Sequence, residues 1–201
     1  HPTFNRAAQY LGLTITRIPV RDDFRADVDA MAGAISANTI AILGSAVCFP
    51  YGVIDPIAEL SEVAEANGLW LHVDACVSGY TAPFCRELGY PIPDFDFTVP
   101  GVKSISADLH KYGFCAKGTS TVLYRNPDCE KYQPFEFEEW PMGYFSNPNV
   151  ASTRPGGSIS AAWAVMNYLG HDGYMRLNER LMAMRKRYMD GINAIDGVRI
   201  N

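Results

Sequence analysis

Ser106-Ala107-Asp108-Leu109-His110-Lys111-Tyr112-Gly113 is the stretch that decides how this chain is interpreted, together with His72-Val73-Asp74-Ala75-Cys76 before it. A lysine amine can form a Schiff base with an aldehyde. A carboxylate at the end of a strand can keep a pyridine nitrogen protonated. Pyridoxal phosphate needs both groups from its protein, so the combination of Lys111 and Asp74 predicts this cofactor.

Apolar runs around these two motifs predict an α/β fold. Residues 11–20, 39–45 and 69–73 are nearly continuous apolar runs, which are typical of parallel strands covered on both faces. Helical patterns over residues 27–37 and after Asp55-Pro56 alternate with them, and Asp55 is expected to cap the second helix. The expected architecture is a mostly parallel central sheet with helices on both faces.

The lysine is expected on a connection between two strands. Residues 103–107 and 119–124 read as short strands, and Lys111 lies between them. Two long loops are predicted elsewhere. The first covers residues 81–101, and the second, over residues 134–155, is rich in aromatic residues and is interpreted as a surface or interface loop.

Two helices are predicted near the end of the sequence, over residues 159–168 and from Tyr174 onward. Apolar residues at spacings of three and four in the second helix predict a core-facing seam; they are Tyr174, Leu177, Leu181, Met184, Tyr188, Ile192 and Ile195. We assign residues 1–170 to a cofactor-binding large domain and residues 171–201 to a connecting helix and the start of a small domain.

Charge and composition narrow the class of protein. The 201 residues carry a net charge of -5 with dispersed Lys and Arg, so no nucleic-acid surface is expected. No apolar run approaches the roughly 20 residues of a membrane span. The five cysteines form no CxxC pair and no metal-ligand spacing, so we expect no metal site and a reducing compartment, the cytoplasm. A small-molecule partner is favoured.

Each candidate residue also has a simpler interpretation. Lys111 could be a surface lysine, although the few charges around it predict partial burial, which would lower the lysine pKa and leave a free amine. Asp74 could be a strand-end cap. Cys76 lies on the same side of an extended chain as Asp74 and could pack on the cofactor ring. Lys117 could be a solvated loop charge, and a terminal His1 alone indicates nothing.

The motifs taken together resemble the pyridoxal-phosphate decarboxylase group, which has the aspartate aminotransferase-type fold, and within it the sphingosine-1-phosphate lyases. The resemblance extends from His1 to Asn201. It rests on His72 to Cys76, Phe95 to Val102, Ser104 to Gly113, Lys117-Gly118 and Arg154 to Gly157.

The resemblance implies a role for each candidate. Lys111 matches the Schiff-base lysine, and Asp74 matches the partner of the pyridine nitrogen. Cys76 matches the small residue packed on the ring. His110 matches a histidine that contacts the cofactor phosphate, and His1 matches the histidine that stacks on the ring.

The resemblance also implies an assembly. Lys117 matches a second lysine that the lyases need, and the loop over residues 154–158 resembles one that these obligate dimers present near the partner's cofactor. We therefore expect a homodimer with shared active sites. In the family, the Gly-Thr phosphate-binding loop precedes the stacking histidine, which matches residue 1 here, so the chain is interpreted as a large-domain fragment. Whether a membrane anchor lies upstream of residue 1 is left open.

The implied reaction is retro-aldol cleavage of a phosphorylated long-chain amino alcohol to a fatty aldehyde and phosphoethanolamine. The same lysine and aspartate would also serve an amino-acid α-decarboxylase acting on tyrosine or glutamate. A non-catalytic fragment of either enzyme is the third interpretation.

Overall fold

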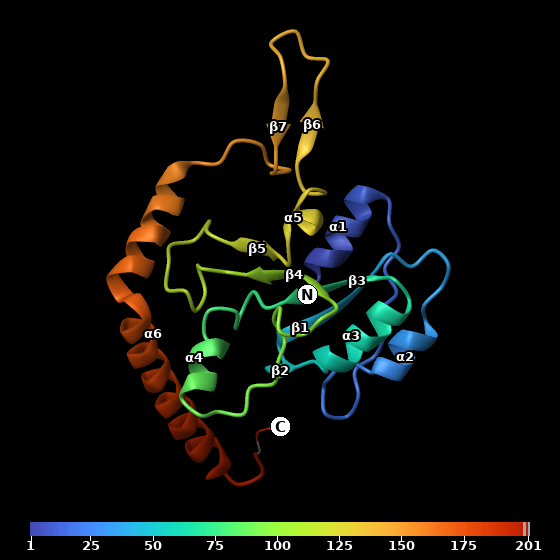
Figure 1. Cartoon of the computed structure of the whole chain (residues 1–201). Coiled ribbons are helices and arrows are strands. Elements are labelled where there is room, and N and C mark those ends of the chain that lie inside the picture. The colour runs from blue at the N-terminus through green and yellow to red at the C-terminus, as the bar shows by residue number, and fades with distance from the viewer. Residues whose placement is uncertain (199, 201) are drawn as a thin grey trace.

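The computed structural model describes residues 1–198 and 200. A five-stranded sheet in the order β2-β1-β3-β4-β5 forms the centre of the molecule (Figure 1). The strands are β1 (Ala41–Cys48), β2 (Val53–Ile54), β3 (Trp70–Asp74), β4 (Val102–Ala107) and β5 (Thr121–Tyr124). β1, β3 and β4 are parallel, and β2 and β5 pair antiparallel at the two sides. The predicted α/β class is confirmed.

Helices cover both faces of this sheet. They are α1 (Thr3–Leu11), α2 (Val28–Gly33), α3 (Ile57–Ala66), α4 (Ala82–Glu87), α5 (Pro127–Glu130) and α6 (Gly156–Asn193). α3 lies so close to β1 that a Cβ at Gly44 would come within 2.6 Å of the Ile57 side chain. On the other face the Phe4 ring of α1 packs edge-on against His72, with 5.8 Å between centroids.

β3 separates an apolar face from a polar one. Leu71 and Val73 are fully buried in the main core, whereas Trp70 and His72 alternate with them on the opposite face and are partly buried. Because successive side chains of a strand point to opposite faces, the polar residues of β3 form a row that ends at Asp74.

Two sequence predictions of local structure are wrong. Residues 11–20 form no strand; Val20 makes one isolated bridge to Ala26, and the apolar side chains of this segment stay largely exposed because no neighbouring strand pairs with them. Residues 81–101, predicted as a loop, contain α4, whose first turn holds Pro83. Proline is tolerated in a first turn, so its presence did not exclude a helix there.

Asp55 does not cap α3, which is a further correction. Its carboxylate instead accepts hydrogen bonds from the backbone N–H groups of Ala26 at 2.8 Å and Ser45 at 2.7 Å. Asp55 therefore ties β1 to the segment before α2. Burial raises the pKa of this carboxyl against the lowering effect of the two hydrogen bonds.

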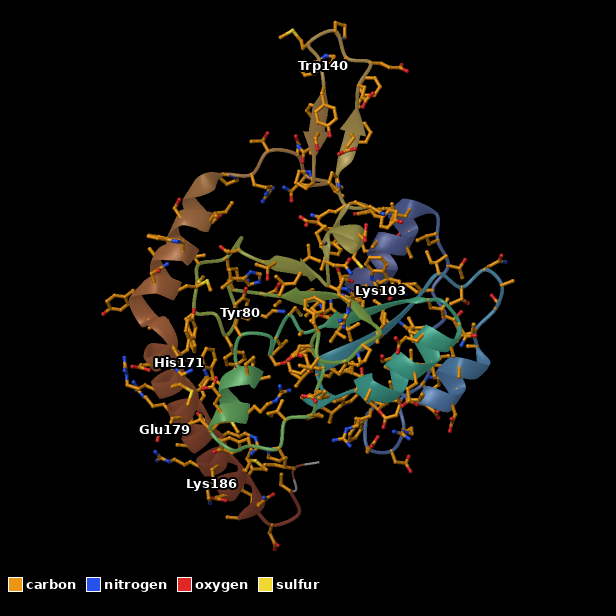
Figure 2. The ribbon with its side chains drawn as sticks, in the orientation of Figure 1. Tyr80, Lys103, Trp140, His171, Glu179 and Lys186 are labelled. Atoms are coloured by element: carbon orange, nitrogen blue, oxygen red, sulfur yellow. The ribbon has the colours of Figure 1, made fainter. Side chains whose placement is uncertain are left out.

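The predicted aromatic loop over residues 134–155 contains a β-hairpin. Its strands, β6 (Phe135–Phe137) and β7 (Phe145–Asn147), pair antiparallel and project from the body of the molecule (Figure 1). Trp140 lies near the tip of this hairpin (Figure 2). The surface location is as expected, but the period-2 pattern was too short to reveal the strands.

α6 joins the two helices that the sequence predicts. Gly170 interrupts its helical backbone with φ 56° and ψ −175°, which places a kink between the two predicted segments. The seam is core-facing only at its start: Tyr174 is buried, but Met184 and Tyr188 are 54% and 66% exposed. The seam prediction is therefore wrong for the second half of the helix.

The proposed boundary between residues 170 and 171 stays a prediction, and residues 199 and 201 of its second part lie outside the described residues. Within residues 1–198 and 200, no helix combines the length and the apolarity that crossing a bilayer requires.

Candidate active site

Lys111 lies on the connection between β4 and β5, as predicted. Its Nζ is 2.9 Å from Sγ of Cys76, in the segment that follows β3, and 2.9 Å from Oδ2 of Asp108, which follows β4. Ligand sites of open α/β sheets lie beyond the carboxyl ends of the strands. The lysine, the thiol and the carboxylate therefore meet where such a site is expected.

Asp74 ends β3 and is buried. Its Oδ1 accepts two hydrogen bonds, from the Cys76 backbone N–H and from the Ser106 hydroxyl, both at 3.1 Å. Both bonds end on the same oxygen, and Oδ2 has no hydrogen-bond partner within residues 1–198 and 200, so it can accept from a further donor. Since Asp74 binds the backbone of Cys76 and Lys111 binds its thiol, the acid and the amine lie at one edge of the sheet.

The ionisation of Lys111 differs from the prediction. Burial lowers the lysine pKa, as expected, but hydrogen bonds to Cys76 and Asp108 outweigh that effect and raise the pKa above its usual value. The amine is therefore protonated in this arrangement. The expectation that partial burial leaves a free amine is wrong, because it ignored the acid three residues earlier.

Asp108 is the site residue that the sequence interpretation missed. One of its oxygens pairs with Lys111 and lies 3.6 Å from Nε2 of His110, while the other accepts the Ser120 hydroxyl. An acidic residue three positions before a candidate lysine, inside a turn, was the available signal. We call Asp74, Cys76, Asp108, His110 and Lys111 the carboxyl-edge cluster.

His110 is oriented by the backbone. Its Nδ1 lies 2.6 Å from the carbonyl oxygen of Thr119, which can only accept, so Nδ1 carries the proton and donates. Nε2 then faces Asp108. The predicted role of His110 as a phosphate contact is not tested by this geometry.

The loop that carries Lys111 is held by α6. Gly113 packs so closely that a Cβ there would lie 2.6 Å from the Leu109 carbonyl oxygen. The Tyr174 hydroxyl of α6 donates to the Gly113 carbonyl at 2.9 Å, and the Thr119 hydroxyl donates to the Ser158 carbonyl at 3.3 Å. These contacts fix the loop against the long helix at two points after Lys111.

The remaining two predicted site residues lie outside these contacts. His1 is exposed at the start of α1, and its Nδ1 accepts from the Thr3 backbone N–H at 3.2 Å. Lys117 is exposed in the turn before Gly118, which has φ 93°. The structure thus brings four of the predicted residues into one connected set of contacts, and the roles predicted for His1 and Lys117 stay predictions.

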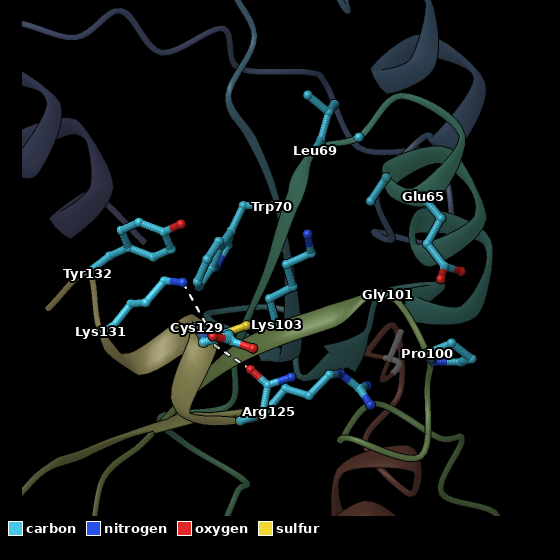
Figure 3. A pocket seen from close by; sticks show the side chains of 14 residues that line it. Glu65, Leu69, Trp70, Pro100, Gly101, Lys103, Arg125, Cys129, Lys131 and Tyr132 are labelled. Carbon is cyan, nitrogen blue, oxygen red and sulfur yellow. Dashed lines mark hydrogen bonds and ion pairs between the residues drawn. The ribbon is translucent and has the colours of Figure 1, made fainter.

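A second candidate region lies at the opposite, amino edge of the sheet. There a cavity of about 500 Å³ is lined by Trp70, Lys103, Arg125 and Tyr132, among others (Figure 3). The Arg125 guanidinium already donates to backbone carbonyl oxygens, at 2.7 Å for Val102. The arginine of this cavity is therefore already committed to the fold.

Comparison with known proteins identifies the family of the chain. Residues 1–198 match the family described as the pyridoxal-dependent decarboxylase conserved domain. A sphingosine-1-phosphate lyase of Arabidopsis thaliana is 48% identical over 195 residues, covering 97% of this chain and 36% of that protein. A probable L-tyrosine/L-aspartate decarboxylase of Methanothermobacter thermautotrophicus is 36% identical, covering 98% of this chain and 53% of that protein.

The structure of a sphingosine-1-phosphate lyase from Burkholderia pseudomallei superimposes with a TM-score of 0.96 at 39% identity. The match covers 99% of this chain and 46% of that chain. The chain therefore spans roughly a third to a half of the relatives it resembles, and the matched residues 1–198 include both edges of the sheet.

Proposed function

The chain belongs to the pyridoxal-dependent decarboxylase family, and from that membership we propose that its carboxyl-edge cluster holds pyridoxal phosphate for a carbon–carbon lyase. The proposed substrate is a phosphorylated long-chain amino alcohol of the sphingosine-1-phosphate type, and the products are a fatty aldehyde and phosphoethanolamine. The observation that supports this most is the pair formed by Lys111 and Asp74, which contact the two ends of one residue, Cys76.

The residues present fit this cofactor. Asp74 has one anchored oxygen and one left for the ring nitrogen. Lys111 supplies the amine for covalent attachment, and Cys76 lies between them to pack against the ring. His110 would contact the phosphate and His1 would stack on the ring, so these five residues are proposed to hold the cofactor.

When bound, pyridoxal phosphate supplies an aldehyde that joins the substrate amine and a protonated ring that accepts electrons from the breaking bond. The side chains of this protein hold and accept the protons that the reaction moves. Lys111 becomes a nucleophile only when its Nζ loses a proton, and Oδ2 of Asp108 at 2.9 Å is placed to accept that proton. Lys117 is proposed to act as a second catalytic lysine that meets the anionic group of the substrate.

The lyase is favoured over a decarboxylase by the residues before the lysine. Ser106-Ala107-Asp108 precedes His110 here, whereas Asn-Pro is commoner at this point in the decarboxylases. The similarity of the chain to lyases of both plant and bacterial origin supports the same choice.

An amino-acid α-decarboxylase of the tyrosine or glutamate type is the second candidate. The 36% identity to the Methanothermobacter protein favours it, because both activities need the same amine and acid. A fragment that does not catalyse by itself is the third. The proposed assembly is a homodimer with shared active sites, and the proposed compartment is the cytoplasm.

Product analysis separates these functions. The protein is incubated with pyridoxal phosphate and either sphingosine phosphate or amino acids, and fatty aldehyde, phosphoethanolamine and carbon dioxide are measured. Aldehyde and phosphoethanolamine in equal amounts, lost in Lys111→Ala and kept in Lys103→Ala, support the lyase. Carbon dioxide from tyrosine or glutamate without aldehyde would reverse the ranking, and no product from any substrate would favour the fragment.

A further inference from the structure

The polar face of β3 carries a row of hydrogen-bonding groups behind the carboxyl-edge cluster. In the parallel pairing of β3 with β4, His72 lies opposite Ser104 and Asp74 lies opposite Ser106. Trp70 precedes His72 on the same face, because residues two apart on a strand point the same way. Alternate positions of two neighbouring strands thus bring five polar side chains into one line.

Each neighbouring pair in this line is within hydrogen-bond distance. Nε1 of Trp70 lies 2.8 Å from the Ser104 hydroxyl, which lies 2.8 Å from Nδ1 of His72. On the other side of the ring, Nε2 of His72 lies 3.3 Å from the Ser106 hydroxyl. That hydroxyl lies 3.1 Å from Oδ1 of Asp74.

The chemistry of the two ends sets the direction of the bonds at Trp70, at Asp74 and at Nε2 of His72. An indole N–H can only donate, so Ser104 accepts from Trp70 and has its own proton free for Nδ1 of His72. An ionised carboxylate can only accept, so Ser106 gives its proton to Asp74 and must accept from Nε2 of His72. Nε2 therefore carries a proton, and in the neutral imidazole Nδ1 accepts the proton of Ser104.

We propose that His72 is a positioning residue for Asp74: as the neutral Nε2–H tautomer it aligns the Ser106 hydroxyl on Oδ1, so that Oδ2 is presented to the pyridine nitrogen. The presentation of Oδ2 to the pyridine nitrogen rests on the proposed function, whereas the assignment of the His72 tautomer does not. Hydrogen bonds that all run in one direction polarise one another, so each donor toward Asp74 is strengthened by the one behind it.

Burial and packing support this assignment. Burial lowers the pKa of the His72 imidazole, against the raising effect of Asp74, so the ring is kept in its neutral form. The Phe4 ring of α1 packs against the imidazole edge-on and limits its rotation. A charged imidazole would also donate from Nδ1 and leave the Ser104 proton without its acceptor.

A spectroscopic experiment tests the tautomer without any cofactor. The chain has four histidines, so the protein labelled with nitrogen-15 in histidine has few imidazole signals, and His72→Gln identifies those of His72 by their loss. We expect the neutral ring with its proton on Nε2 at neutral pH. A proton on Nδ1, or on both nitrogens, would overturn the proposal.

A binding experiment tests the positioning role. Pyridoxal phosphate is compared with its 1-deaza analogue, in which carbon replaces the ring nitrogen and no contact with Asp74 is possible. His72→Phe should weaken binding of pyridoxal phosphate about tenfold, as expected for the loss of a hydrogen bond to a charged group. It should leave binding of the analogue unchanged, and His72→Gln, which can still donate to Ser106, should restore much of the loss.

The outcomes separate this proposal from the proposed function. Equal weakening for both probes would mean that His72 acts only through the fold, and no weakening for either would remove its role; both results contradict the positioning proposal. Failure of the unchanged protein to bind either probe would contradict the proposed function and, with it, the presentation of Oδ2 to the ring nitrogen. The imidazole spectrum would still decide the tautomer.

Discussion

The two edges of the central sheet use similar residues in opposite ways. At the amino edge, Arg125 donates to backbone carbonyl oxygens and Lys103 lies 5.9 Å from the centre of the Trp70 ring (Figure 3). At the carboxyl edge, Lys111 contacts a thiol and a carboxylate, and a second carboxylate, Asp74, has an oxygen left over. The amino edge has a cavity whose arginine serves the fold, and the carboxyl edge has the reactive groups.

This difference shows that room for a ligand and chemistry for a reaction are separate properties. The Arg125 contacts hold β5 to the loop before β4, so they serve the fold. The contacts of Lys111 instead set the ionisation of an amine, which is the property that covalent catalysis needs. Variants at matched positions of the two edges can test this contrast.

The largest effect is expected from removing the amine at each edge. Pyridoxal phosphate is added to the protein, the adduct is reduced with borohydride, and the modified lysines are found by mass spectrometry. Lys111→Ala should abolish the specific adduct, because no other amine touches the cluster, among the described residues. Lys103→Ala should keep it. An adduct that survives in Lys111→Ala at equal yield would remove the distinction between the edges.

A glycine from each edge tests how tightly the backbone is packed. Gly113→Ala should destabilise the protein by about 3 kcal/mol, because the added methyl collides with the Leu109 backbone, and should lower adduct formation at Lys111. Gly68→Ala, which has φ 66° and open space around it, should cost only about 1 kcal/mol and leave the adduct unchanged.

Urea unfolding gives the two free energies of unfolding. Equal losses for both variants, or normal adduct formation in Gly113→Ala, would show that the lysine loop is not held by this contact.

An acid from each edge tests the control of lysine ionisation. Asp108→Asn should lower the pKa of Lys111, because the hydrogen bond and the charge that raise it are removed while the lowering effect of burial stays. Adduct formation should then begin at lower pH than in the unchanged protein. The matched variant Asp128→Asn, which removes the exposed partner of Lys131 at 3.3 Å, should leave that pH profile in place. An unchanged profile in Asp108→Asn would contradict the assigned cause.

The sequence predicted the parts of the structure that local chemistry determines. The apolar run before Asp74 and the short strand predicted over residues 103–107 became β3 and β4, and the parallel arrangement brought their carboxyl ends together. The aspartate was found because it ends a strand, and the lysine was found because it lies in the connection that follows the next parallel strand. The strand prediction for residues 11–20 was wrong because an apolar run becomes a strand only when another strand pairs with it. The local sequence pattern cannot show that pairing.

The parts of the site that were missed depend on contacts between strands. Asp108 was visible in the motif, but its effect on Lys111 needed the turn geometry. The row through His72 needed the register of β3 against β4, which places Ser104 and Ser106 beside it. A single strand with polar residues at alternate positions indicated a polar face, but not which hydroxyl groups would complete the line.

The smallest effect is expected from an exposed ion pair outside both edges. His171 lies on α6 (Figure 2), 2.8 Å from Glu87 of α4. Hydrogen bonds to Glu87 and then Asp172 raise the pKa of its imidazole. A raised pKa contributes stability that is present below the ordinary histidine pKa of about 6.5 and is lost as pH rises through the folded-state value. Glu87→Gln should therefore lower the urea midpoint in mildly acidic solution and not in alkaline solution.

Asp190→Asn is the matched control for this pair. It removes the partner of Lys186, 2.7 Å away on the same helix, and that carboxylate raises the pKa of a lysine that is already charged throughout the same range. Its effect on the urea midpoint should not change between mildly acidic and mildly alkaline solution. If Glu87→Gln behaves in the same way as Asp190→Asn, His171 does not titrate against Glu87, and the contact between α4 and α6 depends on packing alone.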